Sequence, residues 1–192
     1  MKKILALLFI LTSHQASAFE MMGMIGYDTP LYSGKPASYQ TSGGGVGYGF
    51  FGRLDLGPGA VETGFLYAPT SLTWTVASSQ VTANGSYWLF PVMYRVDVLP
   101  PFLNFAIGPD FAYMGNTSYS IAGASVGSNA SGFKSHFGAQ MSIQGTQDLG
   151  ENLSAVLDLR YRQAIGNAIA VNGQSAQFNF FMISLGLQKR LE

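Results

Sequence analysis

The feature that most constrains this chain is an alternation of bulky apolar residues with small, polar or charged ones. Successive side chains of a β-strand point to opposite faces, so a period of two predicts strands with one apolar face. In the segment 87–98, for example, Phe90 and Val92 share one face, whereas Met93 and Arg95 share the other. Eight segments follow this pattern: 19–27, 45–50, 61–68, 87–98, 103–113, 136–144, 153–162 and 181–188.

One segment departs from the alternation. Beyond Pro69 the apolar residues change parity to Leu72, Trp74 and Val76. Such a change indicates either a β-bulge or a strand end that projects beyond the region in which parity is fixed. The sequence leaves both alternatives open.

The connections between the segments are of two kinds. Those at 57–60, 99–101 and 148–152 are short and contain Gly, Pro or Asn, which are turn residues. Those at 28–42, 115–132 and 164–176 are long, polar and rich in Gly, Ser, Ala and Asn. A further connection at 78–85 falls on the same end, but it is shorter or carries more strand. This distribution predicts antiparallel strands in up-and-down order, with tight turns at one end and long loops at the other.

The charged residues indicate which face of the strands points outward and which points inward. They make up only 10% of the chain, against about 25% in ordinary soluble domains, and a soluble sandwich or lipocalin would show its charges on the outside. Bulky apolar faces outward and polar faces inward are typical of a transmembrane β-barrel, whose sheet must close because lipid offers no partner for backbone groups. The sequence therefore predicts an all-β fold, an eight-stranded antiparallel up-and-down transmembrane β-barrel.

The inward face is expected to carry a polar network. Five arginines and five carboxylates share the parity of the small residues, and an eight-stranded barrel is only wide enough for its own side chains. Buried charges need partners, so a structural network is expected instead of a ligand or ion site. Its predicted members are Arg53, Asp55, Glu62, Arg95, Asp97, Asp110, Asp158, Arg160, Arg162 and Arg190.

The amino terminus has the features of a secretory signal peptide. Lys2 and Lys3 precede an apolar run at 4–11, and residues 16–18 have the small-x-small form that signal peptidase cleaves. We expect residues 1–18 to be removed, so that 19–192 form the barrel domain. An even number of strands then places both termini on the periplasmic side.

The chain lacks the residues that several classes of function need. The chain has no cysteine, and its 10 basic and 10 acidic residues give no excess charge for nucleic acid. The segment 47–52 reads G-x-G-x-x-G, but no helix pattern follows it, as a dinucleotide site would require. The inward carboxylates stand singly on different strands, unlike a calcium loop. We expect no cofactor and no metal.

The one catalytic candidate is a histidine. His136 is the only imidazole left once the signal is removed, and it follows Ser135. Serine and histidine occur in the active sites of lipid A deacylases and palmitoyltransferases of the outer membrane, but such a site also needs a carboxylate that orients the base. We expect a histidine at the rim that faces water, and no catalytic residue.

The segments 90–95, 106–109 and 158–162 resemble strands of the small outer-membrane β-barrel proteins of the OmpA/OmpX type, a porin-like superfamily, and the similarity spans the mature chain. The chain departs from the family in ending Arg190-Leu191-Glu192 instead of on an aromatic residue. The resemblance implies the outer membrane of a Gram-negative bacterium, contact with its lipid and lipopolysaccharide, and insertion by the barrel-assembly machinery.

The resemblance also implies a non-enzymatic role in envelope structure or in surface interaction through the long loops, whose ligand the sequence does not identify. Two alternatives stay open. One is a lipid-modifying barrel enzyme, and the other is a soluble exported barrel that binds a small apolar ligand.

Overall fold

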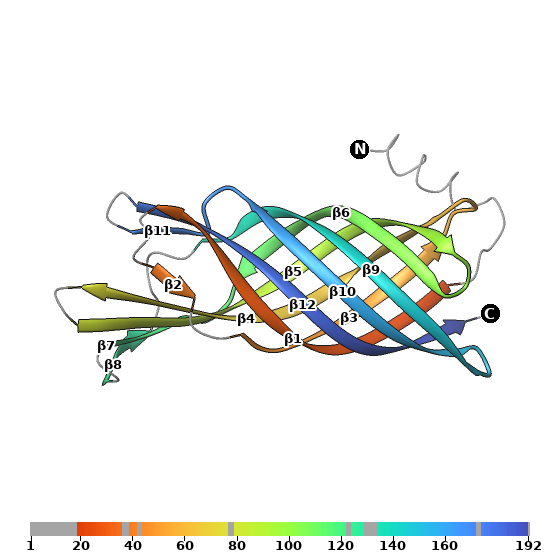
Figure 1. Cartoon of the computed structure of the whole chain (residues 1–192), viewed down its shortest axis with the longest axis horizontal. Coiled ribbons are helices and arrows are strands. Elements are labelled where there is room, and N and C mark those ends of the chain that lie inside the picture. Colours follow the sequence, from red (N-terminus) through yellow and green to blue (C-terminus); the bar gives the residue numbers. More distant parts are fainter. Residues whose placement is uncertain are drawn as a thin grey trace, which may run out of the picture.

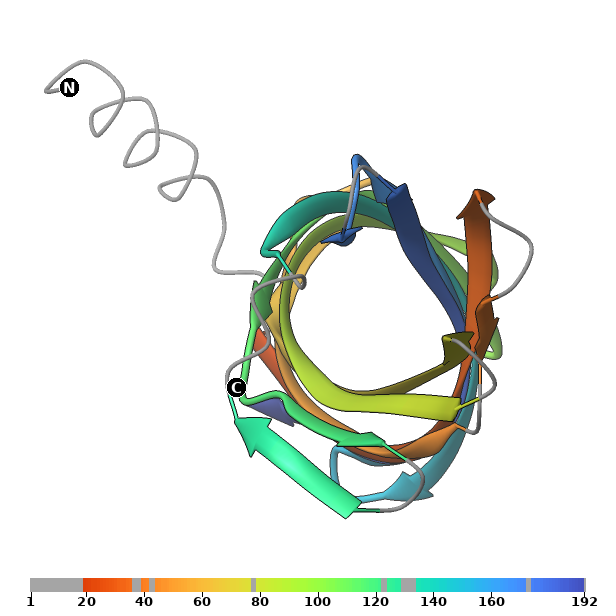
Figure 2. The ribbon, with the colours of Figure 1, turned by 90° about the vertical axis from the view of Figure 1, so that its left-hand side faces the viewer.

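Eight long strands close into one antiparallel ring (Figures 1 and 2). The computed structural model describes residues 19–35, 39–41, 44–76, 79–121, 124–128, 134–171 and 174–191, so the predicted signal peptide lies outside the described residues. The ring strands are β1 (Phe19–Lys35), β3 (Gly45–Asp55), β4 (Ala60–Val76), β5 (Ser79–Leu99), β6 (Leu103–Met114), β9 (His136–Gly150), β10 (Leu153–Ile165) and β12 (Gln174–Leu191).

Each ring strand pairs with its neighbour along the chain, and β1 pairs with β12 to close the ring. The predicted eight-stranded up-and-down barrel is therefore confirmed. Among the described residues, no helix is long and apolar enough to cross a membrane.

Tight turns join the strands at one end, which we call the turn end (right in Figure 1). Leu56 N donates to Gly59 O at 2.7 Å, and Phe102 N donates to Leu99 O at 2.7 Å. The third turn has Asn152 at a φ of 62°, a left-handed conformation that Asn tolerates better than most residues. The predicted short turns are thus found together.

Strand structure continues further than predicted at the opposite end, which we call the loop end. β1 runs on to Lys35, and four short strands form there: β2 (Tyr39–Thr41), β7 (Ser118–Ile121), β8 (Ala124–Ser128) and β11 (Ile169–Val171). The interpretation of 28–42, 115–132 and 164–176 as loops was therefore too broad. Backbone ladder bonds do not depend on apolar side chains, so polar residues extend a ladder that is already started.

The change of parity beyond Pro69 also finds its cause at the loop end. The β4–β5 register is constant from Ala60 opposite Arg95 to Val76 opposite Ser79, so the described ladder holds no bulge in β4. Leu72 keeps the inward parity of Glu62 and is 1% exposed. The hairpin projects beyond the barrel in Figure 1, which agrees with the alternative of a projecting strand end. The side chains of residues 74 and 76 lie outside the described part of the chain.

The alternation of faces follows the prediction along the ring. Phe90 and Val92 are 47% and 54% exposed on the outer wall, whereas Met93 and Arg95 are 0% and 1% exposed in the lumen. The lumen is less polar than expected, because an apolar cluster fills part of it: Met22, Met24, Phe51, Leu66, Ala68, Tyr87, Leu89, Ala112, Val156, Phe180 and Met182. A closed interior of this width must be packed by side chains, and bulky ones fill it best.

Candidate functional site

The centre of the lumen holds an arginine that is bound on every side. Arg160 on β10 is fully buried. Its Nη2 lies 3.1 Å from both Glu62 Oε1 and Asp158 Oδ2, and its Nη1 donates to Gln140 Oε1 at 3.1 Å. Its guanidinium also lies over the Phe51 ring, 4.6 Å from the centroid. Strands β3, β4, β9 and β10 are thus tied together across the lumen by one side chain.

The partners of Arg160 have further partners of their own. Asp158 Oδ2 accepts hydrogen bonds from Ser142 Oγ at 2.8 Å and from Gln144 Nε2 at 2.7 Å. Arg95 Nη1 lies 3.6 Å from Glu62 Oε2. We call Glu62, Arg95, Asp158 and Arg160 the central cluster. Its two arginines balance its two carboxylates, so the buried group carries no net charge.

A second arginine lies nearer the loop end. Arg162 Nε donates to both oxygens of Asp110 at 2.9 Å, and Nη2 donates to Asp110 Oδ1 at 2.7 Å. Its Nη1 lies 3.0 Å from His136 Nε2 and donates to Phe178 O at 3.2 Å. Such a forked arginine–carboxylate pair is among the strongest polar contacts in proteins. We call Asp110, His136 and Arg162 the loop-end cluster.

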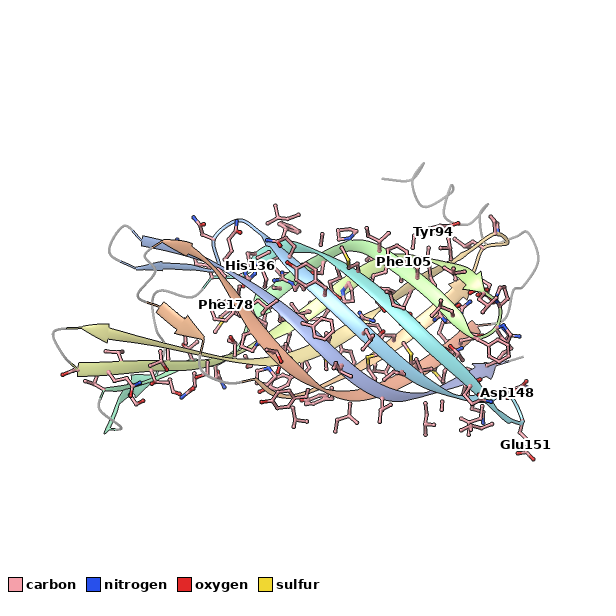
Figure 3. The ribbon with its side chains drawn as sticks, viewed as in Figure 1. Tyr94, Phe105, His136, Asp148, Glu151 and Phe178 are labelled. Carbon is pink, nitrogen blue, oxygen red and sulfur yellow. The ribbon has the colours of Figure 1, made fainter. Side chains whose placement is uncertain are left out.

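His136 does not face water as expected. It lies near Phe178 at the loop end of the barrel (Figure 3) and is 6% exposed. Its ring packs edge-on against Tyr87 at 5.2 Å between centroids. Its Nδ1 lies 3.0 Å from Lys134 O. Because a carbonyl only accepts, Nδ1 carries the proton and Nε2 accepts from Arg162. The expectation of a rim histidine was wrong, because His136 has the inward parity of β9.

A third group of charges lies at the turn end of the lumen. Glu20 is 2% exposed and pairs with Arg53 Nη1 and Arg190 Nη2, each at 2.9 Å. Arg53 also lies 3.1 Å from Asp55 and 3.8 Å from Asp97. We call these five residues the mouth cluster. The side chains of Asp97 and Arg190 are 44% and 50% exposed, so this cluster is partly solvated.

Each of the ten predicted network residues therefore forms an ion pair, but in three clusters instead of one. Sequence reasoning missed Glu20 because the first strand has the weakest alternation. It also missed the uncharged partners Gln140, Ser142 and Gln144, although their shared parity with His136 on β9 was a usable signal.

The serine and histidine considered for catalysis lie on opposite faces of the chain. Ser135 is exposed, and its Oγ accepts from Met114 N at 3.1 Å, whereas both ring nitrogens of His136 are engaged in the lumen. The two side chains therefore form no nucleophile and base pair. Within the described ranges, no group of three or more His, Asp or Glu residues could hold a metal ion.

The glycines of the segment 47–52 serve packing. The segment lies within β3 and continues as strand, so no helix opens on it. A Cβ at Gly49 would lie 2.7 Å from Cε2 of Phe51, and one at Gly47 would lie 2.8 Å from Cε of Met182. Missing side chains at these positions make room for the apolar cluster.

Two solved structures have a similar fold. Ail, the attachment invasion locus protein of Yersinia pestis, matches with a TM-score of 0.52 at 12% identity, over 90% of this chain and 99% of Ail. The outer membrane protein OprG from Pseudomonas aeruginosa matches with a TM-score of 0.52 at 9% identity, over 93% of this chain and 98% of OprG. No protein-family model and no curated protein sequence matches. The chain has the fold of the small outer-membrane β-barrels of the OmpA/OmpX type.

Proposed function

We propose that this chain is a non-enzymatic integral protein of the bacterial outer membrane, with a role in envelope structure or in surface contacts through its loop end. The observation that carries the proposal is the segregation of side chains across the barrel wall. Leu185, Val92 and Ile107 are 66%, 54% and 50% exposed outside, while Arg160 and Asp158 are 0% and 1% exposed inside. A soluble protein would expose the charges and bury the apolar residues.

The proposal includes an orientation. Phe19 pairs with Leu191, so both ends of the barrel lie at the turn end, which would face the periplasm after removal of residues 1–18. The projecting β4–β5 hairpin and the short strands β7 and β8 would then reach outside the cell (Figure 1). The outer wall would contact lipid and lipopolysaccharide, and the barrel-assembly machinery would insert the chain.

Membrane placement is tested by fractionation and by gel migration of unboiled and boiled samples in detergent. We expect the mature chain, starting at Phe19, in the outer-membrane fraction and a change of migration on boiling, because the closed barrel resists detergent until heated. Recovery of the chain in the soluble periplasm would overturn the proposal and favour a carrier of small apolar ligands.

The absence of enzymatic activity on lipid A is tested by mass spectrometry of lipid A from cells with and without the protein. We expect identical spectra, because Ser135 and His136 point to opposite faces. An acyl chain gained or lost only when the protein is present would overturn the non-enzymatic assignment, and His136→Ala would show whether that histidine is responsible.

A further inference from the structure

The outer wall has a row of aromatic rings near the loop end. Tyr67 on β4 lies opposite Trp88 on β5, and Trp88 lies opposite Tyr113 on β6, so the three residues are neighbours across three strands. The rings of Tyr67 and Trp88 meet edge-on at 5.1 Å between centroids, and Tyr113 is 55% exposed. Aromatic girdles mark the edges of the apolar band in membrane barrels. The wall beyond this row would therefore lie at the level of the polar headgroups.

Polar residues follow the aromatic row toward the loop end. Ser86 lies two residues from Trp88 on the same face of β5, and Asn84 lies two residues further, opposite Ser118 on β7. Asn84 and Ser118 are exposed, and so is Asn116 between β6 and β7. Four residues of strand separate Trp88 from Asn84, which is about 13 Å. A ligand that spans this distance would contact both the rings and the polar side chains.

The rings and the polar residues line one open groove. Gly115 also lines it and lies beside Ser86, because Gly115 N donates to Ser86 O at 2.8 Å. A Cβ at Gly115 would lie 2.7 Å from Ser86 Oγ, so the missing side chain keeps the groove open. The volume of the groove is about 590 Å³, which is within the range of small-molecule sites.

The chemistry of the groove favours an uncharged sugar. No charged residue lines the groove in the described part of the chain, and the segments 63–94 and 111–133 contain none in the sequence. A phosphate or carboxylate ligand would need a cationic partner there. A sugar needs none, because its C–H face packs on aromatic rings and its hydroxyl groups donate and accept hydrogen bonds, as Asn side chains do.

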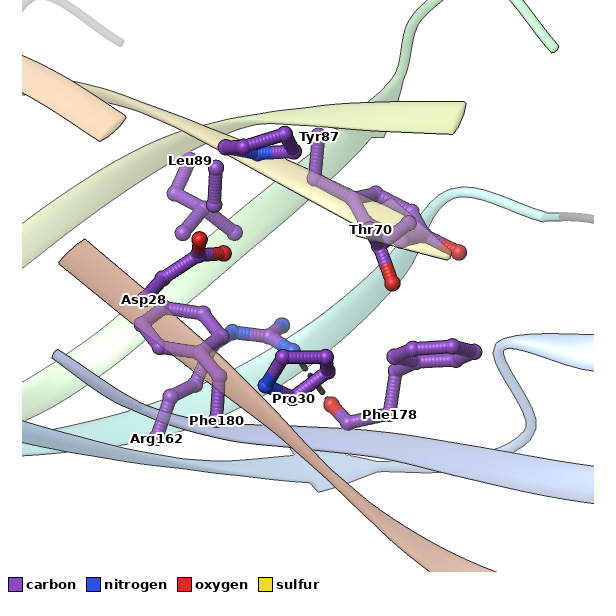
Figure 4. A pocket seen from close by; sticks show the side chains of 10 residues that line it. Asp28, Pro30, Thr70, Tyr87, Leu89, Arg162, Phe178 and Phe180 are labelled. Carbon is purple, nitrogen blue, oxygen red and sulfur yellow. Dashed lines mark hydrogen bonds between the residues drawn. The ribbon is translucent and has the colours of Figure 1, made fainter. Parts of the chain in front are cut away.

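The pocket inside the lumen at this end is too small for a sugar. Tyr87, Leu89 and Phe178 are among the side chains that line it, and they leave a space of about one water molecule (Figure 4). The groove on the outer wall, and not this pocket, therefore offers the room that a ligand needs.

We propose that the groove binds an uncharged sugar unit of lipopolysaccharide. Because the groove lies on the outer wall, it faces molecules of the same membrane leaflet, and the saccharide of lipopolysaccharide lies at the level just beyond the aromatic row. The inference rests on the proposed placement in the outer membrane, which fractionation tests separately. Binding in micelles does not require that placement, so failure of one can be told from failure of the other.

The test uses the full mature chain in micelles of dodecyldimethylamine oxide, a detergent without a sugar headgroup. The ligand is the core oligosaccharide of lipopolysaccharide, freed from lipid A and dephosphorylated. The chain has two tryptophans, so Trp74→Phe leaves the fluorescence of Trp88 as a local readout. We expect a saturable change of that fluorescence, and we expect the phosphorylated oligosaccharide to bind no more tightly, because no cation lines the groove.

Two variants in this background test the groove itself. Tyr113→Leu should weaken binding about threefold to tenfold, because it removes a ring and keeps an apolar wall. Asn116→Ala should weaken it about fivefold through a lost hydrogen bond, and it lies outside the strands, so it stays informative if Tyr113→Leu does not fold. The matched control is Tyr94→Leu, which removes a ring that is 45% exposed on β5 outside the groove and should leave the affinity unchanged.

Several results would overturn the proposal. One is the absence of a saturable change in the Trp74→Phe chain, provided that its gel migration before boiling shows a folded barrel. Another is an equal loss of affinity in Tyr94→Leu and Tyr113→Leu, which would mean a general effect of the wall. Tighter binding of the phosphorylated oligosaccharide would overturn recognition of an uncharged sugar, and equally tight binding of maltotriose would overturn the assignment to lipopolysaccharide.

Discussion

Asp158 shows how a single residue can stabilise the barrel interior. It accepts from Arg160, Ser142 and Gln144 at once, and without it Arg160 would share Glu62 with Arg95. We predict that Asp158→Ala destabilises the protein by about 3 to 5 kcal/mol, since it leaves a buried guanidinium underpaired. Urea unfolding in detergent or lipid measures the loss, and exposed Glu151→Gln should change stability by no more than about 0.5 kcal/mol.

A double-mutant cycle separates the ion pair from the general loss of packing. Removing Asp158 and Arg160 together should cost less than the sum of the two single losses, because the double variant leaves neither charge unpaired. Strict additivity would mean that water solvates the two side chains, and that the central cluster does not act as a unit.

Parity in the sequence was enough to place these charges inside, but not enough to pair them. Glu62 and Arg160 are 98 positions apart, and Asp110 and Arg162 are 52 apart. Which of them meet depends on the tilt and stagger of the strands around the closed ring, and neither can be obtained from alternation alone. His136 shows the same limit, since its parity pointed inward while its place near a polar connection suggested a rim position.

At the scale of the strands, small residues determine how closely the wall and the lumen contents approach. A Cβ at Gly49 would lie 2.7 Å from the Phe51 ring and 2.9 Å from Phe65 O, whereas one at Gly23 would have nothing within 4 Å. We predict that Gly49→Ala costs about 1 to 3 kcal/mol through overpacking, and that Gly23→Ala is neutral or slightly stabilising. Equal unfolding free energies for the two variants in urea would contradict this assignment.

The outer faces of the strands should tolerate charge only near their ends. Leu185 is 66% exposed in the middle of β12, and Leu191 is 36% exposed at its turn end. We predict that Leu185→Arg costs about 2 to 4 kcal/mol in a bilayer and that Leu191→Arg costs about 0 to 1 kcal/mol. Unfolding of both variants in lipid vesicles measures the difference, and similar costs at the two depths would argue against a lipid-facing wall.

The strand count and the turn end could be predicted from sequence because both follow from local patterns. The extension of β4 beyond Pro69 was one of the two alternatives that the sequence left open, but the matching extension of β5 could not be predicted, because it depends on pairing between the two segments. Thr73 opposite Thr82 and Ser71 opposite Asn84 form hydrogen-bonded pairs across that hairpin, and Ser, Thr and Asn read equally well as loop residues. Only the partner strand distinguishes the two outcomes.

For the whole molecule, the lumen contents decide whether the barrel is a channel. Large side chains that are each 1% exposed or less fill the lumen around the central cluster: Phe51, Leu66, Met93 and Met182. Among them, Arg160 contacts both Asp158 and Glu62. An eight-stranded barrel leaves no room beyond such side chains. We predict that the protein in a planar bilayer shows no steady large conductance.

A double variant tests this prediction by removing the Arg160 side chain from the lumen without leaving an unpaired charge. Asp158→Ala combined with Arg160→Ala deletes one residue of each sign and keeps the Glu62–Arg95 pair, in which Oε2 and Nη1 lie 3.6 Å apart, so the barrel should still form and migrate as folded before boiling. With the bridge across the lumen gone, ions and water gain a path between the mouth cluster and the loop-end cluster, and single-channel recordings should show openings that the unmutated protein lacks. A large steady conductance of the unmutated protein would instead mean that these side chains line an aqueous path.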